Sequence, residues 1–141
     1  MATDTPATPI TPPAFNRPPY LRTATVAIVT TAALHLPEDE GFAPRDQSFR
    51  VLDGMRRDYR LGHLSTNFDR SGLALDLNVV FPIDRLNEMA ARGEIGRVAS
   101  EHLSFLGAQD ETMSTIRLDT GPAAATRLLA AGVQIALLVP I

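Results

Sequence analysis

The chain has 141 residues, a net charge of −3 and no cysteine. This length fits one domain with a substantial core, and the weak charge without long runs of one sign argues against nucleic-acid or membrane-surface partners. The absence of cysteine excludes disulfides, thiolate zinc sites and thiol nucleophiles among these residues. Neither a secretion signal nor an apolar run long enough to cross a bilayer is visible, so we expect a cytoplasmic protein.

Residues 1–20 contain six of the eleven prolines. Proline donates no hydrogen bond to a strand ladder, and this segment has few apolar side chains to bury. We therefore expect a flexible Pro-rich arm over residues 1–20 and a single α/β domain over residues 21–141.

Residues 23–30 are uncharged, β-branched and apolar in their second half, which predicts a buried strand. Thr30, Thr31 and His35 lie at or just past its carboxyl end. Ligands of parallel α/β sheets bind at that end of the strands, so these three side chains are candidate site residues. The alternative is that the two hydroxyls bond the nearby backbone and cap a turn.

The middle of the chain predicts a long surface loop at residues 37–49, followed by two short strands near residues 48–52 and 59–63. Residues 64–82 begin with a dense set of small polar side chains. We interpret Asn67, Asp69 and Arg70 as a polar network in a loop, a common location for functional residues.

A helix is predicted from Pro82 to Gly93, because proline fits the first turn and glycine the position after the last. Asp84 and Arg85 lie in its first turn. They are candidates to line the site. The competing interpretation is that they only place charge at the N-terminus of the helix and form an ordinary ion pair on the surface.

A last helix, capped by Asp119 or Thr120, should run to Ala131 and stop at Gly132. Of the residues after Gly132, only Gln134 is polar. Such a run predicts a strand buried on both faces. Helix followed by strand, with a second buried strand at residues 24–30, predicts a three-layer α/β fold with a mostly parallel central sheet.

The three histidines, His35, His63 and His102, all fall in or beside predicted loops. Together with Asp69 they could bind a metal and support a metal-dependent hydrolase, although the sequence contains no closely spaced pair of ligands. Residue patterns alone therefore leave an α/β domain with a polar loop cluster and name no reaction.

From about residue 24 to its end, the sequence resembles the selenoprotein B family of glycine, sarcosine, betaine and D-proline reductases. The segments that carry the resemblance are 26–31 with His35, 62–72 (GHLSTNFDRSG), 76–86 (DLNVVFPIDRL), 93–96 (GEIG), 102–107 (HLSFLG) and 132–140 (GVQIALLVP). They occur in this order over more than four fifths of the chain.

The resemblance implies reductive cleavage of a C–N bond in an amino acid or a betaine-like substrate. In that family a redox-active selenocysteine or cysteine directly follows the strand that matches residues 133–140, so it is expected after Ile141. An in-frame UGA codon read as stop, a fragment or a natural short form would each explain a chain without it. The resemblance implies no metal and no cofactor within these residues, with selenocysteine in the full-length product.

The resemblance and the fold together assign candidate roles. Proton transfer is assigned to His35 or His63, and binding of a substrate anion to Arg70 or Arg85. The remaining candidates for substrate contacts are Thr30, Thr31, Asn67, Asp69 and Asp84. The expected partners are a small amine or amino-acid substrate, and other subunits of a reductase complex or a second copy of the chain. An alternative is a non-catalytic subunit or interaction module with the same fold.

Overall fold

The computed structural model describes residues 16–62 and 71–141, with only the backbone of Leu73 and Ala74. The strands are β1 (Thr25–Thr30), β2 (Leu34–His35), β3 (Arg50–Asp53), β4 (Arg60–Leu61), β5 (Arg97–Val98), β6 (Glu101–Ser104) and β7 (Ile135–Val139). The α-helices are α1 (Ser71–Leu75), α2 (Ile83–Ala91) and α3 (Gly121–Ala130). Short helical turns span η1 (Leu21–Thr23), η2 (Leu77–Val79) and η3 (Ile116–Thr120).

The main sheet is built around β1. Strand β7 pairs with it in parallel along one side, over five residues. Strands β5 and β6 pair with it in parallel, one after the other, along the opposite side, and β3 adds an antiparallel edge beyond β6. The expectation of an α/β fold with a mostly parallel sheet is confirmed. Strands β2 and β4 form a separate antiparallel pair.

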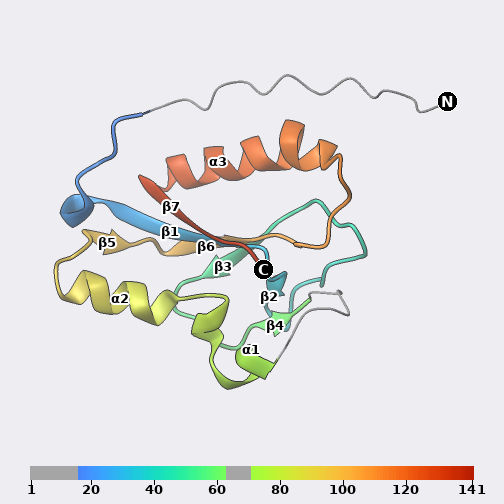
Figure 1. Cartoon of the computed structure of the whole chain (residues 1–141), viewed down its shortest axis with the longest axis horizontal. Helices are drawn as coiled ribbons and strands as arrows, with labels where there is room; N and C mark the ends of the chain where they lie inside the picture. The colour runs from blue at the N-terminus through green and yellow to red at the C-terminus, as the bar shows by residue number, and fades with distance from the viewer. Residues whose placement is uncertain (1–15, 63–70) are drawn as a thin grey trace.

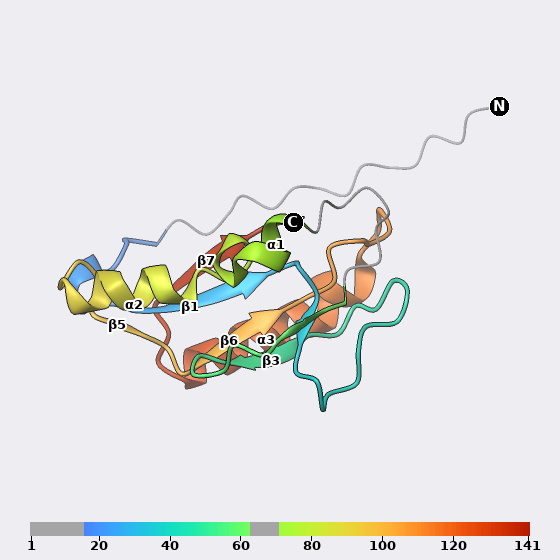
Figure 2. The same ribbon diagram turned by 90° about the horizontal axis from the view of Figure 1, so that it is seen from below.

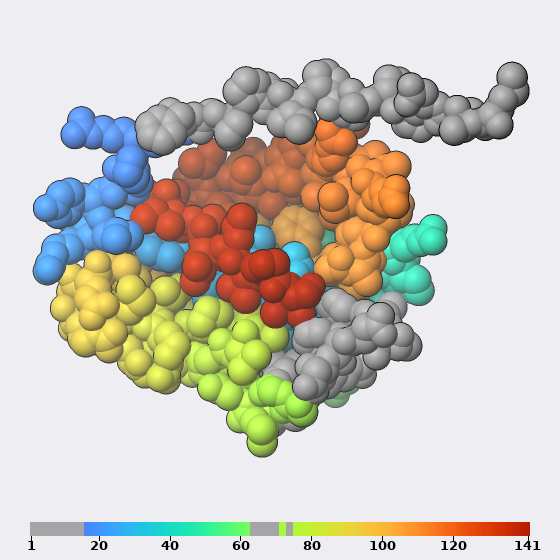
Figure 3. Space-filling view, viewed as in Figure 1, coloured from blue at the N-terminus to red at the C-terminus, as the bar shows by residue number. Residues whose placement is uncertain are grey.

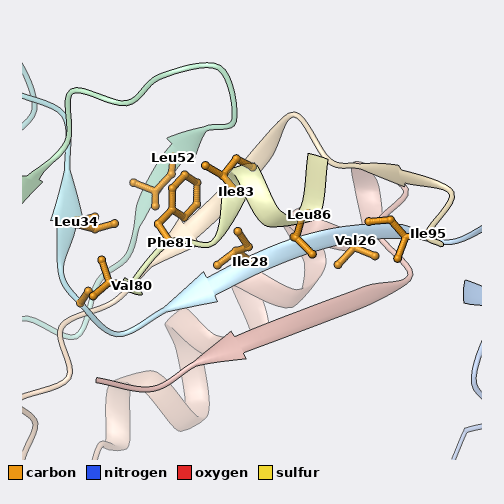
Figure 4. Close-up of a cluster of buried hydrophobic side chains, with 10 residues drawn as sticks. Val26, Ile28, Leu34, Leu52, Val80, Phe81, Ile83, Leu86 and Ile95 are labelled. Carbon is orange, nitrogen blue, oxygen red and sulfur yellow. The ribbon is translucent and has the colours of Figure 1, made fainter. Parts of the chain in front are cut away.

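Helices cover the sheet on two faces, with α3 on one and α2 on the other (Figures 1 and 2). Because successive side chains of a strand point to opposite faces, β1 contributes to both halves of the core. Val26 and Ile28 pack with Phe81, Ile83 and other residues on the α2 side (Figure 4). The cluster on the α3 side consists of Ala27, Ala99, Leu103, Phe105, Ala124, Leu128 and Val133.

The helix boundaries follow the expected signals at all four ends, since Thr120 is the N-cap residue of α3 and Pro122 lies in its first turn. Helix α2 starts directly after Pro82, and Gly93 and Gly132 adopt φ of +71° and +75° after α2 and α3. A left-handed residue of this kind ends a helix with little strain only when it is glycine. The cap hydrogen bond expected at the start of α3 is absent, because the Thr120 hydroxyl donates to the Gln47 carbonyl oxygen (2.6 Å). None of the described helices has the length and apolar character that a bilayer span requires.

Strand β7 corrects one prediction. It is not buried on both faces: the side chains of Leu137 and Leu138 are 38% and 69% exposed. The physical reason is its position, since none of the described strands pairs with its outer side. The fully buried parallel strand is β1, which has neighbours on both sides.

The predicted arm lies mostly beyond the described residues. Residues 16–20 have no regular structure and are largely exposed, and residues 1–15 lie outside the described ranges. A flexible arm over residues 1–20 therefore stays a prediction.

Candidate functional site at the carboxyl edge of the sheet

The carboxyl ends of β1 and β7 are fastened together by Thr31. Its N–H donates to the carbonyl oxygen of Val139 (3.1 Å), which continues the β1–β7 pairing past the end of β1. Its hydroxyl oxygen accepts a hydrogen bond from the N–H of Ile141 (2.7 Å). The residue at position 141 is thus held at the edge of the sheet where ligands of this fold class bind.

Gly107 completes this edge from the loop after β6. A Cβ atom at this position would lie 2.7 Å from the carbonyl oxygen of Ile141 and 3.0 Å from that of Thr31. Real Cβ atoms essentially never show the first of these contacts, so glycine is what allows the loop to lie against Ile141. Three segments, after β1, after β6 and after β7, therefore converge at one place.

Thr30 supports this edge from within the core. It is fully buried, and its hydroxyl oxygen accepts from the N–H of Ala32 (3.2 Å). Ser104, at the end of β6 and equally buried, accepts from the N–H of Leu34 (2.7 Å). Both hydroxyls satisfy backbone groups of the turn between β1 and β2, which is the alternative that the sequence left open for Thr30.

His35 is a half-buried residue of β2. Its Nδ1 lies 2.9 Å from the carbonyl oxygen of Leu36. Since a carbonyl only accepts, Nδ1 carries the proton in the neutral ring, and Nε2 presents a lone pair. The ring packs edge-on to Phe42, with 6.4 Å between the ring centroids. Among the described residues no group bonds Nε2, which leaves it available to accept a proton.

Asp84 and Arg85 are both engaged in contacts at the surface of α2. Asp84 accepts from Asn78 (2.9 Å) and from Arg57 (2.8 Å), and these hydrogen bonds lower the pKa of its carboxyl. Arg85 pairs with Glu88 (2.7 Å), and both side chains are about half exposed. Within the described part of the chain, no hydrogen bond or ion pair joins either residue to Thr30, Thr31 or His35. The candidates His63, Asn67, Asp69 and Arg70 lie outside the described residues.

His102 corrects the expectation that every histidine lies in or beside a loop. It is a fully buried residue of β6. Its Nδ1 accepts a hydrogen bond from the N–H of Ile28 (2.9 Å). Ile28 lies between the residues of β1 that pair with β5 and those that pair with β6, so the ring supplies a partner where neither strand does. Burial lowers the pKa of the ring to about 4. The ring therefore serves the fold as a hydrogen-bond acceptor. This use excludes His102 from the metal site of three histidines that the sequence suggested.

The described residues contain no group of three His, Cys, Asp or Glu side chains arranged to hold a metal ion. His63 and Asp69 lie outside that part of the chain.

Two residues of the site, Gly107 and Ser104, are not among the candidates that the sequence predicts. Both lie in or next to a strand that the sequence did not predict, because Glu101–Ser104 mixes charged, polar and apolar residues without clear alternation. The usable signal was the segment 102–107, which carried the resemblance and ends in a glycine.

The comparisons with known proteins give one informative relative. No family model and no solved structure matches the chain. The chain is 34% identical over 135 residues to D-proline reductase subunit gamma of Acetoanaerobium sticklandii. The matched region covers 92% of this chain and 54% of that protein, so the chain spans about half the length of the relative. The chain is therefore related to a subunit of a reductase.

Proposed function

We propose that this chain is part of a selenoprotein-B-type reductase component that cleaves a C–N bond in an amino acid or a betaine-like substrate. The observation that carries the proposal is the position of Ile141. Thr31 and Gly107 hold it at the carboxyl edge of the sheet, where a redox-active residue directly after it would face a ligand. The relationship to a reductase subunit supports the same reaction class.

The redox residue of the proposal is a selenocysteine or cysteine after Ile141. A selenolate or thiolate there supplies nucleophilic and reducing chemistry. In the net reaction the C–N bond takes up two electrons and two protons to give C–H and N–H. The selenolate and a neighbouring thiolate are oxidised together to a selenenyl sulfide, and an external dithiol returns the two electrons.

The roles of this chain's own residues follow from what they can donate or accept. Thr31 positions the backbone that leads to the redox residue. His35 transfers a proton through Nε2, because Nδ1 is occupied by the Leu36 carbonyl oxygen. Arg85 binds a substrate carboxylate after exchanging its surface partner Glu88. Thr30 contributes by holding the turn after β1, and a substrate contact by Asp84 requires it to release Asn78 or Arg57.

The remaining proposed roles fall to residues of segment 63–70, which lies outside the described residues. We assign proton transfer also to His63, an anion contact to Arg70 and polar positioning to Asn67 and Asp69. The expected partners are a small amine or amino-acid substrate and the other subunits of a reductase complex.

The test begins with the gene. We expect codon 142 to be UGA, followed in frame by sequence that contains a cysteine, and growth with radioactive selenium should label a protein longer than 141 residues. The longer product should oxidise a dithiol in the presence of one of proline, glycine, sarcosine or betaine. The variant His35→Gln should lower this turnover at least tenfold. An ordinary stop codon followed by unrelated sequence, with no labelled product, would refute the proposal.

A further inference from the structure

The turn from Leu106 to Gln109, which follows β6, is held by the side chain of Gln109. Its Nε2 donates to the carbonyl oxygens of Asp46 (2.6 Å) and Leu106 (3.0 Å). Its backbone N–H donates to the carbonyl oxygen of Gly107 (2.9 Å). Both atoms that Nε2 contacts are carbonyl oxygens, which only accept, so the orientation of the side-chain amide is fixed. This turn is the one that places Gly107 against Ile141.

The Asp46 end of this contact is fixed by other interactions. Asp46 lies in the loop formed by residues 37–49 and forms an ion pair with Arg50 (3.1 Å), and the two side chains are only 16% and 17% exposed. The guanidinium of Arg50 also lies 4.4 Å from the centre of the Phe42 ring. The loop therefore offers Gln109 an acceptor that is held independently of the turn after β6.

The same loop contacts His35 through Phe42, with 6.4 Å between the two ring centroids. Phe42 also shares a buried cluster with Leu106, and Ala108 packs against that cluster. Figure 3 shows the turn after β6, in orange, between the end of the chain, in red, and part of the loop, in teal. The loop therefore contacts both the side chain assigned to proton transfer and the turn that lies against Ile141.

The oxygen of the Gln109 amide behaves differently from its nitrogen. Oε1 is buried, and no hydrogen bond reaches it within the part of the chain that the structure describes. A buried acceptor without a partner lowers stability, which offsets part of what the two hydrogen bonds of Nε2 contribute. The amide therefore contributes more to the position of the turn than to the stability of the fold.

We infer that Gln109 is a positioning residue of the carboxyl edge. It holds the turn after β6 to Asp46, which keeps Gly107 against the carbonyl oxygen of Ile141 and fixes the direction in which the chain leaves the sheet. Its catalytic consequence rests on the proposed function, because the redox residue of that proposal follows Ile141. The holding of Ile141 concerns only the residues of this chain and is tested separately.

The first test is hydrogen exchange of the chain with the substitution Gln109→Met. Methionine keeps the length of the side chain and removes both donors. The Ile141 amide, which donates to Thr31 Oγ1, should exchange about tenfold faster than in the wild type, a factor that corresponds to one lost hydrogen bond. Gln109→Glu separates donation from space filling, because its carboxylate presents only acceptors to the two carbonyl oxygens. Exchange at Ile141 in this variant should be at least as fast as in Gln109→Met.

The matched control is Gln47→Met. Gln47 is also half-buried, and its Oε1 accepts hydrogen bonds from the N–H groups of Thr115 (2.9 Å) and Ile116 (3.1 Å). The substitution therefore also removes two hydrogen bonds between the loop of residues 37–49 and a later segment. It should leave exchange at Ile141 within about twofold of the wild type, because the lost contacts lie elsewhere.

The second test is turnover by the longer product that the proposed function requires. Since Gln109 acts through the turn and not on the substrate, Gln109→Met should lower kcat about tenfold and leave KM within about twofold. Gln47→Met should change neither. A wild-type product without turnover would refute the proposed function, and hydrogen exchange of the 141-residue chain then decides the role of Gln109 by itself.

Four outcomes would overturn the inference. The first is unchanged exchange at Ile141 in Gln109→Met. The second is an equal acceleration in Gln47→Met, which is a general loosening of the fold. The third is wild-type exchange in Gln109→Glu, because the two donors are then not what holds the turn. The fourth is an active longer product whose kcat Gln109→Met leaves unchanged.

Discussion

Replacing His102 by asparagine tests how the imidazole contributes to the fold. The side-chain oxygen of asparagine can take the place of Nδ1 and accept the N–H of Ile28, but it does not titrate. His102→Leu removes the acceptor and leaves that buried N–H unpaired, at a cost of about 1–3 kcal/mol. At neutral pH we therefore expect His102→Asn to be more stable than His102→Leu.

The pH dependence gives the sharper result. The pKa of His102 falls from 6.5 to about 4 because burial disfavours the charged ring. Its contribution to stability is complete well above pH 6.5 and is lost progressively as the pH falls from about 6.5 to the folded value near 4. The difference between the two pKa values corresponds to about 3 kcal/mol in the free energy of unfolding. About 2 kcal/mol of this stability is lost between about pH 7.5 and pH 5.

The assay is urea unfolding of the wild type and His102→Asn across this pH range. Protonation of carboxylates also lowers the stability of both proteins. One example is Asp84, whose pKa is lowered first by the hydrogen bond from Asn78 and then by that from Arg57. These losses are the same in the two proteins and cancel when their free energies of unfolding are compared. We expect the wild type to lose about 2 kcal/mol more than His102→Asn by about pH 5. Equal losses in the two proteins would refute the argument that the ring is held neutral by burial.

Further predictions concern the carboxyl edge and the core. Gly107→Ala should destabilise the chain by about 1–3 kcal/mol in urea unfolding, whereas Gly41→Ala, where the nearest atom lies at 3.6 Å, should change it by less than about 1 kcal/mol. Thr31→Val should cost about 1 kcal/mol and speed hydrogen exchange at the amide of Ile141, with no change at the β1 amides; unchanged exchange would contradict the assigned bond. Phe81→Ala should cost about 3–5 kcal/mol, because the ring is fully buried in the core; a cost below about 1 kcal/mol would contradict this role.

The sequence predicted those parts of the fold whose signals are local. The strand at β1 followed from an uncharged β-branched run, and the ends of α2 and α3 followed from Pro82, Gly93 and Gly132. These residues act through their own backbone preferences, so neighbouring residues suffice to interpret them. Strands β5 and β6 were missed for the opposite reason. They are short, and they are strands because β1 and β3 supply their hydrogen-bond partners.

The candidate site divides in the same way. The sequence placed Thr30, Thr31 and His35 at the end of a strand. It could not show which of the two hydroxyls makes a hydrogen bond within the turn that follows. Only the tertiary structure shows that Thr30 bonds to Ala32, whereas Thr31 reaches 110 positions along the chain to Ile141. Asp84 likewise finds Arg57 through chain folding, and that pair could not be inferred from spacing.

By itself, the sequence determined the α/β class, the helix ends and the apolar character of residues 133–141, because each depends on composition and local backbone preference. The order of the strands decided the rest. Since β5, β6 and β7 all pair with β1, that strand is buried, and β7 is the outermost of the described strands on its side, although the two segments are similarly apolar. The same order brought Gly107 against Ile141 and turned His102 into an acceptor for Ile28. Contacts between residues so far apart in the chain arise only when the sheet forms.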